Sequence, residues 1–340
     1  MLENKLKKLK NRIQIIFIFI ILLIVSVGCD KVRGVSISKK ELSMNIGDVD
    51  TLTSKIKTKS HAKYVMWVTS NSDVADIEVI NTFDGEICIV TAKSEGTATI
   101  AVITEEGGYT ATCKVEVTFN PIEPEMLFVE GGTFMMGSNH YNFEQPIHQV
   151  TLSSFNIAKY PITQKEWKAI MVHIPTYTIG DNLPIENVNW IEAEEYITRL
   201  NNATGKNYRL ATEAEWEYAA GGGNKSRGCI YSGSNIIDEV AWYISNTNLD
   251  GPRPVGTKAP NELGIYDMSG NVWEWCGDWY GYYSDTPQIN PSGPKTGEKK
   301  IIRGGGCAYA DVCRVTMRLG RNPQNDVSGA GFRLVLPTQE

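Results

Sequence analysis

Histidine is scarce in this chain, with four residues among 340, and cysteines never occur as a Cys-x-x-Cys pair. A zinc site needs several closely spaced cysteine, histidine or carboxylate ligands, so no zinc centre is expected. Basic residues are also in deficit, because 33 lysines and arginines against 39 acidic residues give a formal net charge of −6. Nucleic-acid binding depends on basic side chains that release counterions from phosphates, so no nucleic-acid partner is expected.

A hydrophobic run long enough to cross a membrane is missing as well. The apolar run from Ile15 to Val25 has eleven residues, whereas a transmembrane helix needs about 20. Five basic residues, from Lys5 to Arg12, precede this run, as in the n-region and h-region of an export signal. Residues 1–28 are therefore predicted to form a signal peptide that is removed on export.

The end of this signal, Ser26-Val27-Gly28-Cys29, resembles a bacterial lipobox. The resemblance implies that Cys29 becomes the acylated first residue of the mature protein, with residues 29–33 as a tether. Stable membrane anchoring takes two lipid signals, which the acyl chains on Cys29 would supply. We therefore predict a lipoprotein of the bacterial cell envelope, held in the outer membrane and exposed at the surface. An ordinary signal peptide with an incidental cysteine is the alternative.

Residues 34–118 contain short alternating runs of apolar and polar residues that are separated by turn residues. This pattern is typical of an all-β sandwich. The runs begin at Val35, Leu42, Tyr64, Glu86, Thr97 and Cys113. Alternation places Cys88 and Cys113 on inward faces, where they form either a disulfide or two buried free thiols. The strings Trp67–Ala75 and Val90–Ile100 resemble the bacterial Ig-like group 2 domain, which implies a spacer without a catalytic group.

Residues 119–125 contain Pro121 and Pro124 and have the composition of a short, stiff linker. Beyond it, residues 126–336 carry three capping boxes, in which a Thr or Asn is followed by Glu at the third position after it. These predict helices that start after Thr163, Asn189 and Thr212. The remaining sequence is rich in glycine, asparagine and aromatic residues, which indicates long ordered loops around small sheets.

Five motifs in this second segment occur in the order of a known family. They are Glu130-Gly-Gly-Thr-Phe-Met-Met-Gly-Ser, Tyr208-Arg-Leu-Ala-Thr-Glu-Ala-Glu-Trp, Gly264-Ile-Tyr-Asp-Met-Ser-Gly-Asn-Val-Trp-Glu-Trp, Arg303-Gly-Gly and Gly331-Phe-Arg-Leu-Val. Together they resemble the formylglycine-generating enzyme, or sulfatase-modifying factor, family. The resemblance implies a multidomain fold class: an all-β Ig-like sandwich followed by an α+β domain of the C-type-lectin-like fold.

Enzymatic activity is not expected, because the sequence departs from the family's active-site pattern. Oxidases of the family bind Cu(I) through two cysteines five positions apart, and soft thiolates suit that ion. Cys313 matches the second cysteine, but the first has no clean partner, since Tyr309 lies near its place, and Gly306 replaces the active-site serine. Copper is therefore not expected. The alternative function is a formylglycine-generating oxidase acting on exported protein cysteines, in which Cys307 would supply the second thiol. A structural disulfide between Cys276 and Cys313 is a further hypothesis.

One structural calcium ion is also implied by the resemblance. Its ligands fall on Asp267, Gly270, Val272 and Glu274, which would supply carboxylate and carbonyl oxygens. In the alternative interpretation Asp267 caps its turn and Glu274 pairs with a buried arginine. A calcium-dependent carbohydrate-binding module is the second functional alternative.

The segment from Arg303 to Val335 alternates a glycine- and arginine-rich framework with positions of no common chemistry. The arrangement resembles the ligand-binding proteins diversified by retroelements, such as the treponemal variable proteins, in which mutagenesis is directed at adenines. Substituting the adenines of an AAC asparagine codon yields residues such as Cys, Ala, Tyr, Asp, Val and Ser, which occupy many of these positions. Met317 and Gln324 need another starting codon. The resemblance implies a variable region over about residues 305–331 and a non-catalytic surface that binds a protein or glycan outside the cell.

The predicted binding residues, here called the variable positions, are Cys307, Ala308, Tyr309, Asp311, Val312, Met317, Leu319, Gly320, Asn322, Gln324, Asn325, Asp326, Val327, Ser328, Gly329 and Ala330. Tyr309 is expected to be the main anchor, because aromatic side chains dominate binding hot spots. Arg314, Arg318 and Arg333 are expected to be buried scaffold. An inert surface loop is the alternative.

Overall fold

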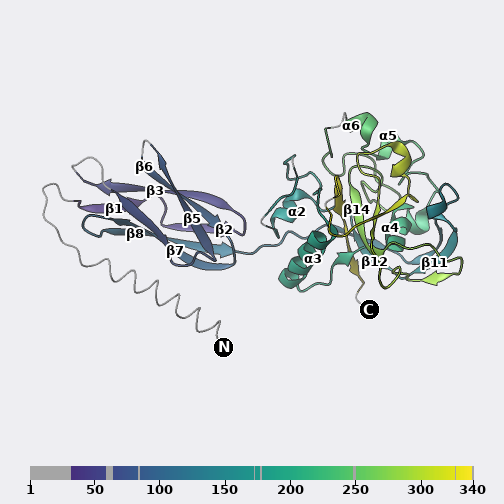
Figure 1. The fold of residues 1–340 in the computed structure, drawn as a ribbon, viewed down its shortest axis with the longest axis horizontal. Helices are drawn as coiled ribbons and strands as arrows, with labels where there is room; N and C mark the ends of the chain where they lie inside the picture. The colour runs from purple at the N-terminus through teal and green to yellow at the C-terminus, as the bar shows by residue number, and fades with distance from the viewer. Residues whose placement is uncertain are drawn as a thin grey trace. The chain divides into compact units, whose positions relative to one another are not determined.

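The computed structural model describes residues 32–58, 64–82, 85–171, 173–176, 178–247, 250–325 and 327–338 of the chain. The chain forms two compact units, Met1–Asn120 and Pro121–Glu340 (Figure 1). The expected signal peptide, the lipidation site Cys29 and the variable position Asp326 lie outside the described residues. Among the helices of the described part of the chain, none is long and apolar enough to cross a membrane.

The first unit is a β-sandwich. One sheet has the strand order β1-β3-β6-β5 and the other the order β2-β8-β7-β4. The strands are β1 (Gly34–Ile37), β2 (Glu41–Asn45), β3 (Val49–Lys57), β4 (Val65–Thr69), β5 (Ala75–Thr82), β6 (Gly85–Ala92), β7 (Gly96–Thr104) and β8 (Thr110–Thr118). Strands β2 and β8 pair in parallel, and the other neighbours are antiparallel. The predicted all-β fold of this unit is confirmed.

Two of these strands, β3 and β5, are not among the predicted runs. In β3 only Leu52 is buried, so its alternation of apolar and polar residues is weak. In β5 two apolar residues, Val79 and Ile80, are adjacent in sequence, which interrupts the period of two. Cross-strand pairing with β6 determines their conformation, and a local pattern does not contain that information.

Inward-facing side chains of both sheets form the sandwich core, including Trp67, Val90 and Ile100. Cys88 and Cys113 belong to the same core and are unbonded. Of the two alternatives, the structure therefore contains buried free thiols. Burial raises the pKa of the Cys88 thiol to about 11, which keeps it protonated and unreactive.

The second unit combines three small sheets with short helices. The sheets have the strand orders β13-β19-β12-β9, β10-β11-β15 and β17-β16-β14-β18. Their strands are β9 (Met126–Val129), β10 (Gly132–Met136), β11 (His148–Leu152), β12 (Phe155–Ala158), β13 (Arg209–Leu210), β14 (Trp273–Trp279), β15 (Gln288–Ile289), β16 (Lys300–Arg303), β17 (Arg318–Arg321), β18 (Ala330–Phe332) and β19 (Leu334–Pro337). The last two strands lie in different sheets, so the residues around Arg333 connect two layers of the unit.

Helices occur where the capping boxes predict them. Thr163 precedes α2 (Gln164–Lys168), Asn189 precedes α3 (Trp190–Thr204) and Thr212 precedes α4 (Glu213–Ala220), each with both hydrogen bonds of the capping box. The other helical segments are α5 (Ile237–Val240), α6 (Ile244–Thr247) and the 3-10 segments η1 (Asn142–Glu144), η2 (Gly223–Lys225) and η3 (Ala310–Cys313). Long loops join these elements, in agreement with the predicted α+β lectin-like fold.

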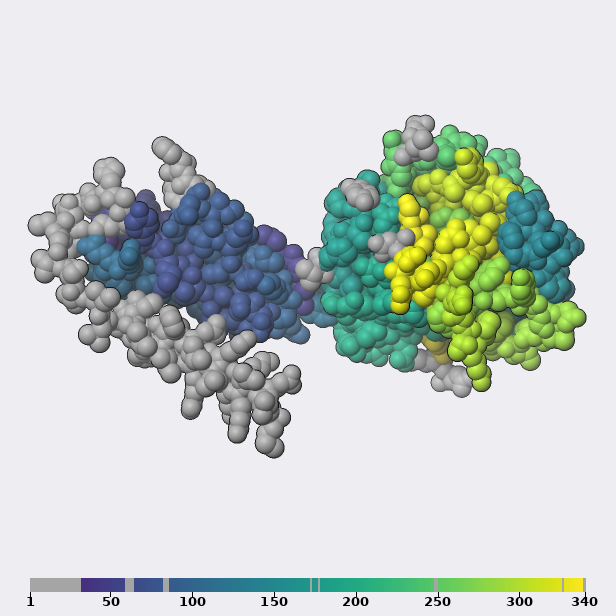
Figure 2. Space-filling view, viewed as in Figure 1, coloured from purple at the N-terminus to yellow at the C-terminus, as the bar shows by residue number. Residues whose placement is uncertain are grey.

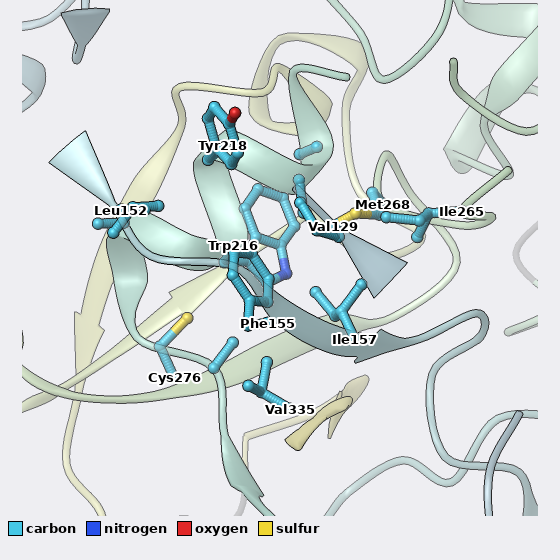
Figure 3. Packing of buried hydrophobic residues seen from close by; sticks show 14 of the residues in the cluster. Val129, Leu152, Phe155, Ile157, Trp216, Tyr218, Ile265, Met268, Cys276 and Val335 are labelled. Atoms are coloured by element: carbon cyan, nitrogen blue, oxygen red, sulfur yellow. The ribbon is translucent and has the colours of Figure 1, made fainter. Parts of the chain in front are cut away.

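The main core of the second unit surrounds the indole of Trp216, which α4 presents to the sheets (Figure 3). Cys276 lies in this core, whereas Cys313 packs in a separate cluster with Ala241 and Tyr243. Both are unbonded. The hypothesis of a Cys276–Cys313 disulfide is therefore wrong, because the two sulfurs belong to different layers of the unit.

Candidate ligand-binding surface

Buried arginines hold the framework of the C-terminal segment. Arg303 at the end of β16 is fully buried, with its Nη2 2.7 Å from Oε2 of Glu217 and its Nε 3.0 Å from Oε1 of Glu213. Arg318 in β17 binds both oxygens of Glu213, at 2.6 and 2.7 Å. Both carboxylates project from α4, whose start the Thr212 capping box determines. The helix therefore supplies the charges that place strands β16 and β17.

Arg333 anchors the connection between β18 and β19. Its guanidinium binds both oxygens of Glu274 on β14, at 2.6 and 2.7 Å, and both side chains are fully buried. Oε2 of Glu274 also accepts a hydrogen bond from Nε1 of Trp216 at 2.7 Å. The expectation that Arg318 and Arg333 are buried scaffold agrees with these contacts.

The same contacts bear on the four expected calcium ligands. Glu274 is occupied by Arg333 and Trp216, as in the alternative interpretation of this residue. Asp267 accepts hydrogen bonds from the Gly256 N–H at 2.7 Å and from Nδ2 of Asn271 at 3.3 Å. Burial raises the pKa of Asp267 to about 6. Protein donors thus engage both carboxylates of the expected set, and calcium binding stays a prediction.

Arg314 connects residues 305–331, here called the variable segment, to η1. Its Nη2 lies 2.7 Å from Oε1 of the buried Glu144, and its Nε lies 3.3 Å from Oδ1 of Asp311. Asp311 in turn accepts a hydrogen bond from the hydroxyl of Tyr141, and Nε2 of His140 lies 3.3 Å from its Oδ1. These bonds lower the pKa of Asp311, with the Tyr141 hydrogen bond as the largest cause.

Most of the described variable positions lie at the surface of this framework. Residues 300–338 occupy the central part of the face of the second unit that Figure 2 shows, in yellow. Tyr309 is 71% exposed, and Asn322, Gln324, Asn325 and Ser328 are also exposed. Cys307, Ala308, Asp311, Val312, Leu319 and Val327 are partly exposed.

The predicted surface positions Met317 and Ala330 are buried, so the prediction was wrong for these two residues. Met317 is 4% exposed and Ala330 is fully buried. Met317 lies directly before β17, where its carbonyl accepts a hydrogen bond from Arg303. Ala330 begins β18 and pairs with Trp273 of β14. Both are held by the framework on which the exposed positions are mounted.

Gly320 is a variable position with little room for variation. A Cβ built on Gly320 would lie 2.9 Å from the ring of Tyr280 and 3.2 Å from Cβ of Lys299. Any side chain there would displace its neighbours in the sheet. This residue therefore contributes shape to the surface, and the exposed side chains around it contribute the chemistry.

Aromatic residues of the loop around η1 extend the surface, and the sequence interpretation did not include them. Tyr141 stacks on Phe143 with ring centroids 5.0 Å apart, and His140 meets Tyr141 edge-on at 4.6 Å. Their link to the variable segment is the Tyr141–Asp311 hydrogen bond, across 170 residues of sequence. The close spacing of His140, Tyr141 and Phe143 in the sequence could have indicated an aromatic cluster, but no sequence pattern indicated its contact with Asp311.

The two late thiols are protected from ionisation. Cys307 donates to the carbonyl of Asn271 at 3.1 Å, and Cys313 contacts the carbonyls of Gly306 and Tyr309. Burial raises the pKa of each thiol to about 12. The thiolate is the form that binds soft metals and acts as nucleophile, so this arrangement disfavours both roles. Across the described residues, no group of three or more histidine, cysteine or acidic side chains could hold a metal ion.

Comparison with known protein families gives two matches that divide the chain. Residues 114–338 match the sulfatase-modifying factor enzyme 1-like domain. Residues 31–115 match the bacterial Ig-like domain, group 2.

Two curated relatives match part of this chain. The chaperone protein LppX of Paenibacillus barcinonensis is 36% identical over 216 residues, which are 49% of this chain and 75% of that protein. The formylglycine-generating enzyme of Streptomyces coelicolor is 36% identical over 170 residues, 45% of this chain and 52% of that enzyme. The chain thus spans about half the length of that enzyme.

Solved structures give the same picture. Treponema denticola variable protein 1 superposes with a TM-score of 0.60 at 30% identity, covering 65% of this chain and 98% of that protein. PvdO from Pseudomonas aeruginosa superposes with a TM-score of 0.54 at 28% identity, covering 63% of this chain and 95% of that protein. The recognised fold and its resemblance to a variable protein are confirmed by these matches.

Proposed function

Because the chain belongs to the family of sulfatase-modifying factor enzyme 1-like domains, we propose that it uses this fold to bind a ligand and not to oxidise cysteine. The observation that carries the proposal is the division of labour in the C-terminal segment. Buried arginine–carboxylate pairs hold the backbone, and exposed side chains such as Tyr309 lie between them. A backbone held in this way tolerates changes at exposed positions with little effect on stability.

Three further observations support a non-catalytic role. Tyr309 lies near the place of the first family cysteine, and burial raises the pKa values of the Cys307 and Cys313 thiols to about 12. The similarity to Treponema denticola variable protein 1 covers nearly all of that protein. The formylglycine-generating enzymes among the relatives favour the alternative, an oxidase acting on cysteines of exported proteins.

In this proposal the protein is a lipid-anchored envelope protein that displays its variable positions outside the cell. The basic and apolar N-terminal signal with Cys29 supports the anchor. The ligand is a protein or a glycan, because the exposed positions mix aromatic, amide and carboxylate side chains. An outer-membrane location and the absence of a nucleic-acid partner belong to the same proposal.

Two experiments test the function. Genomic sequence around the gene should contain a reverse transcriptase gene and a second copy of the codons for residues 305–331 that differs only at adenines. Arrays of glycans and of extracellular proteins then supply probes for the purified chain. For any probe that binds, Tyr309→Ala should weaken binding at least about 30-fold, the scale of a hot-spot residue, and leave the thermal midpoint nearly unchanged.

Phe128→Ala is the matched control, because Phe128 on β9 is a similarly exposed aromatic residue at 60%. It should not change binding. Equal binding by wild type and Tyr309→Ala on every probe would contradict the proposal. Oxygen consumption by the chain with Cu(I) and a cysteine-containing peptide would establish the oxidase instead.

A further inference from the structure

A second candidate site lies in the same unit and uses none of the variable positions. It is a small cavity of about 60 Å³ between β11, the start of α4, the end of β14 and the loop that follows β14. His148, Glu213, Asp278, Tyr282, Tyr283 and Arg318 supply its polar and aromatic lining. The framework residue Arg318 is its nearest link to the variable segment, so the two sites can be tested separately.

Two of the lining residues present acceptors to which no residue in the described part of the chain donates a hydrogen bond. Nδ1 of His148 lies 3.0 Å from the carbonyl oxygen of Pro146. A carbonyl only accepts, so Nδ1 carries the proton and Nε2 of the neutral ring is an acceptor. Oδ2 of Asp278 accepts the Glu213 N–H at 2.9 Å, and no hydrogen bond in the described structure reaches Oδ1. His148 is 4% exposed and Asp278 is 5% exposed.

The donors around the cavity are already engaged. Arg318 binds both oxygens of Glu213 and donates from Nη1 to the carbonyls of Phe143 and Gly281. Tyr283 donates to Oε1 of Glu213 at 3.2 Å. Because Glu213 pairs with Arg318 and Glu217 pairs with Arg303, these four charges balance. The cavity is left with free acceptors and a carboxylate, which favour a positively charged donor.

Aromatic side chains complete the surroundings. Tyr282 is 89% exposed beside the cavity, and Trp279 also lines it. The protein already holds one ammonium group in this way. Nζ of Lys300 lies 4.0 Å from the ring centre of Trp279 and 4.1 Å from that of Trp190, and donates to the carbonyl of Gly277 at 2.7 Å. Trp279 thus contacts a cation and also lines the cavity.

We propose that this cavity binds an alkylammonium group, such as the side chain of a lysine on a partner protein. The ammonium donates to Oδ1 of Asp278 and Nε2 of His148, and its alkyl chain lies against Tyr282. A primary ammonium has three donors and no acceptor, which matches a cavity that offers acceptors. Neutral hydroxyl groups lack the charge that would compensate Asp278.

The state of Asp278 gives the site a pH dependence. Burial, and after it the neighbouring Glu213, raise the pKa of Asp278 to about 7. Glu213 and Glu215 from α4 and Lys300 from β16 are the charged groups that face it, with His148 and Arg318 across the cavity. An ammonium prefers ionised Asp278, so binding should strengthen as the pH rises from 6 to 8.

The experiment titrates the full chain with n-butylammonium chloride and follows backbone amide shifts by NMR, with 1-butanol as the uncharged probe. Saturable shifts near Asp278 and Tyr282 are expected with the ammonium and not with the alcohol. Asp278→Asn keeps an acceptor for the Glu213 N–H but places an amide donor in the cavity, and should weaken binding at least tenfold, about 1.4 kcal/mol. Tyr282→Ala should weaken it about two- to fivefold.

Asp285→Asn is the control for general attraction, since Asp285 is an exposed carboxylate on the same loop. It should bind n-butylammonium as wild type does. The proposal is overturned by the absence of saturable binding, by equal binding of 1-butanol, or by equal loss in Asp285→Asn. If Asp278→Asn unfolds, the exposed Tyr282→Ala variant still decides the question.

Discussion

The two units of this chain are stabilised by different kinds of interior. In the sandwich the buried side chains are apolar, and Thr104 is the one buried polar residue among those described. Its ion pairs, such as Lys39–Asp50, are exposed. The second unit buries Glu213, Glu274, Arg303 and Arg333 in paired form. An apolar core specifies a fold through alternation, whereas a loop-rich unit with little regular sheet uses directional charge pairs to position its backbone.

The largest effect should follow from breaking one buried pair. Arg333→Ala leaves Glu274 buried without its counter-ion, which typically costs about 3–5 kcal/mol. Lys39→Ala in the sandwich removes an exposed partner and should cost about 0–1 kcal/mol. Urea unfolding followed by tryptophan fluorescence reports the second unit, because seven of eight tryptophans lie there. Hydrogen exchange of β3 peptides reports the sandwich. Similar losses for both variants would abolish the distinction between the two interiors.

A smaller effect should separate the units by pH. The folded-state pKa of Asp278 is raised from 3.8 to about 7, so between these values the folded state binds more protons than the unfolded state. Its contribution to stability therefore falls as the pH rises from about 4 to 7. Asp278→Asn removes this term, and the variant should gain on wild type over that range, by on the order of 3 kcal/mol, since one pKa unit corresponds to about 1.4 kcal/mol.

Urea midpoints of both proteins, measured at several pH values, check this prediction. Asp278 lies in the second unit, so the sandwich should show the same pH dependence in both proteins. A constant difference between wild type and Asp278→Asn would mean that Asp278 is ionised throughout the range.

The smallest effect should come from a chelator. Glu274 binds Arg333 and Trp216, and Asp267 accepts from Gly256 and Asn271. Because these partners engage the two carboxylates of the expected ligand set, EDTA should leave the thermal midpoints of both units unchanged. Differential scanning calorimetry with EDTA and with added calcium measures them. A midpoint that rises with calcium in the second unit alone would restore the calcium prediction from the family resemblance.

Local features of the fold were predictable from sequence, and long-range ones were not. The capping boxes at Thr163, Asn189 and Thr212 involve residues three positions apart, so their helices were predicted correctly. Cys276 and Cys313 look like partners in a list of cysteines, but they lie in different clusters. No pattern around these cysteines contains that fact.

The candidate site was predictable to the same extent. Exposure of Tyr309 followed from its place in a glycine-rich loop, and burial of Arg333 followed from its motif. Burial of Met317 did not, because it depends on Arg303 and the start of β17. The contact of Asp311 with Tyr141, and the cavity between His148 and Asp278, join segments more than a hundred residues apart.

The position of β19 has a consequence for how the C-terminal segment can change. This strand follows the variable segment in the chain, yet it lies inside its sheet, between β13 and β12. A substitution between Cys307 and Gly329 leaves β19 intact. A frameshift or early stop there removes an internal strand together with Arg333, so the truncated chain cannot complete its core. In the proposed function, folding itself would screen altered copies, because only a chain that keeps its reading frame completes this sheet.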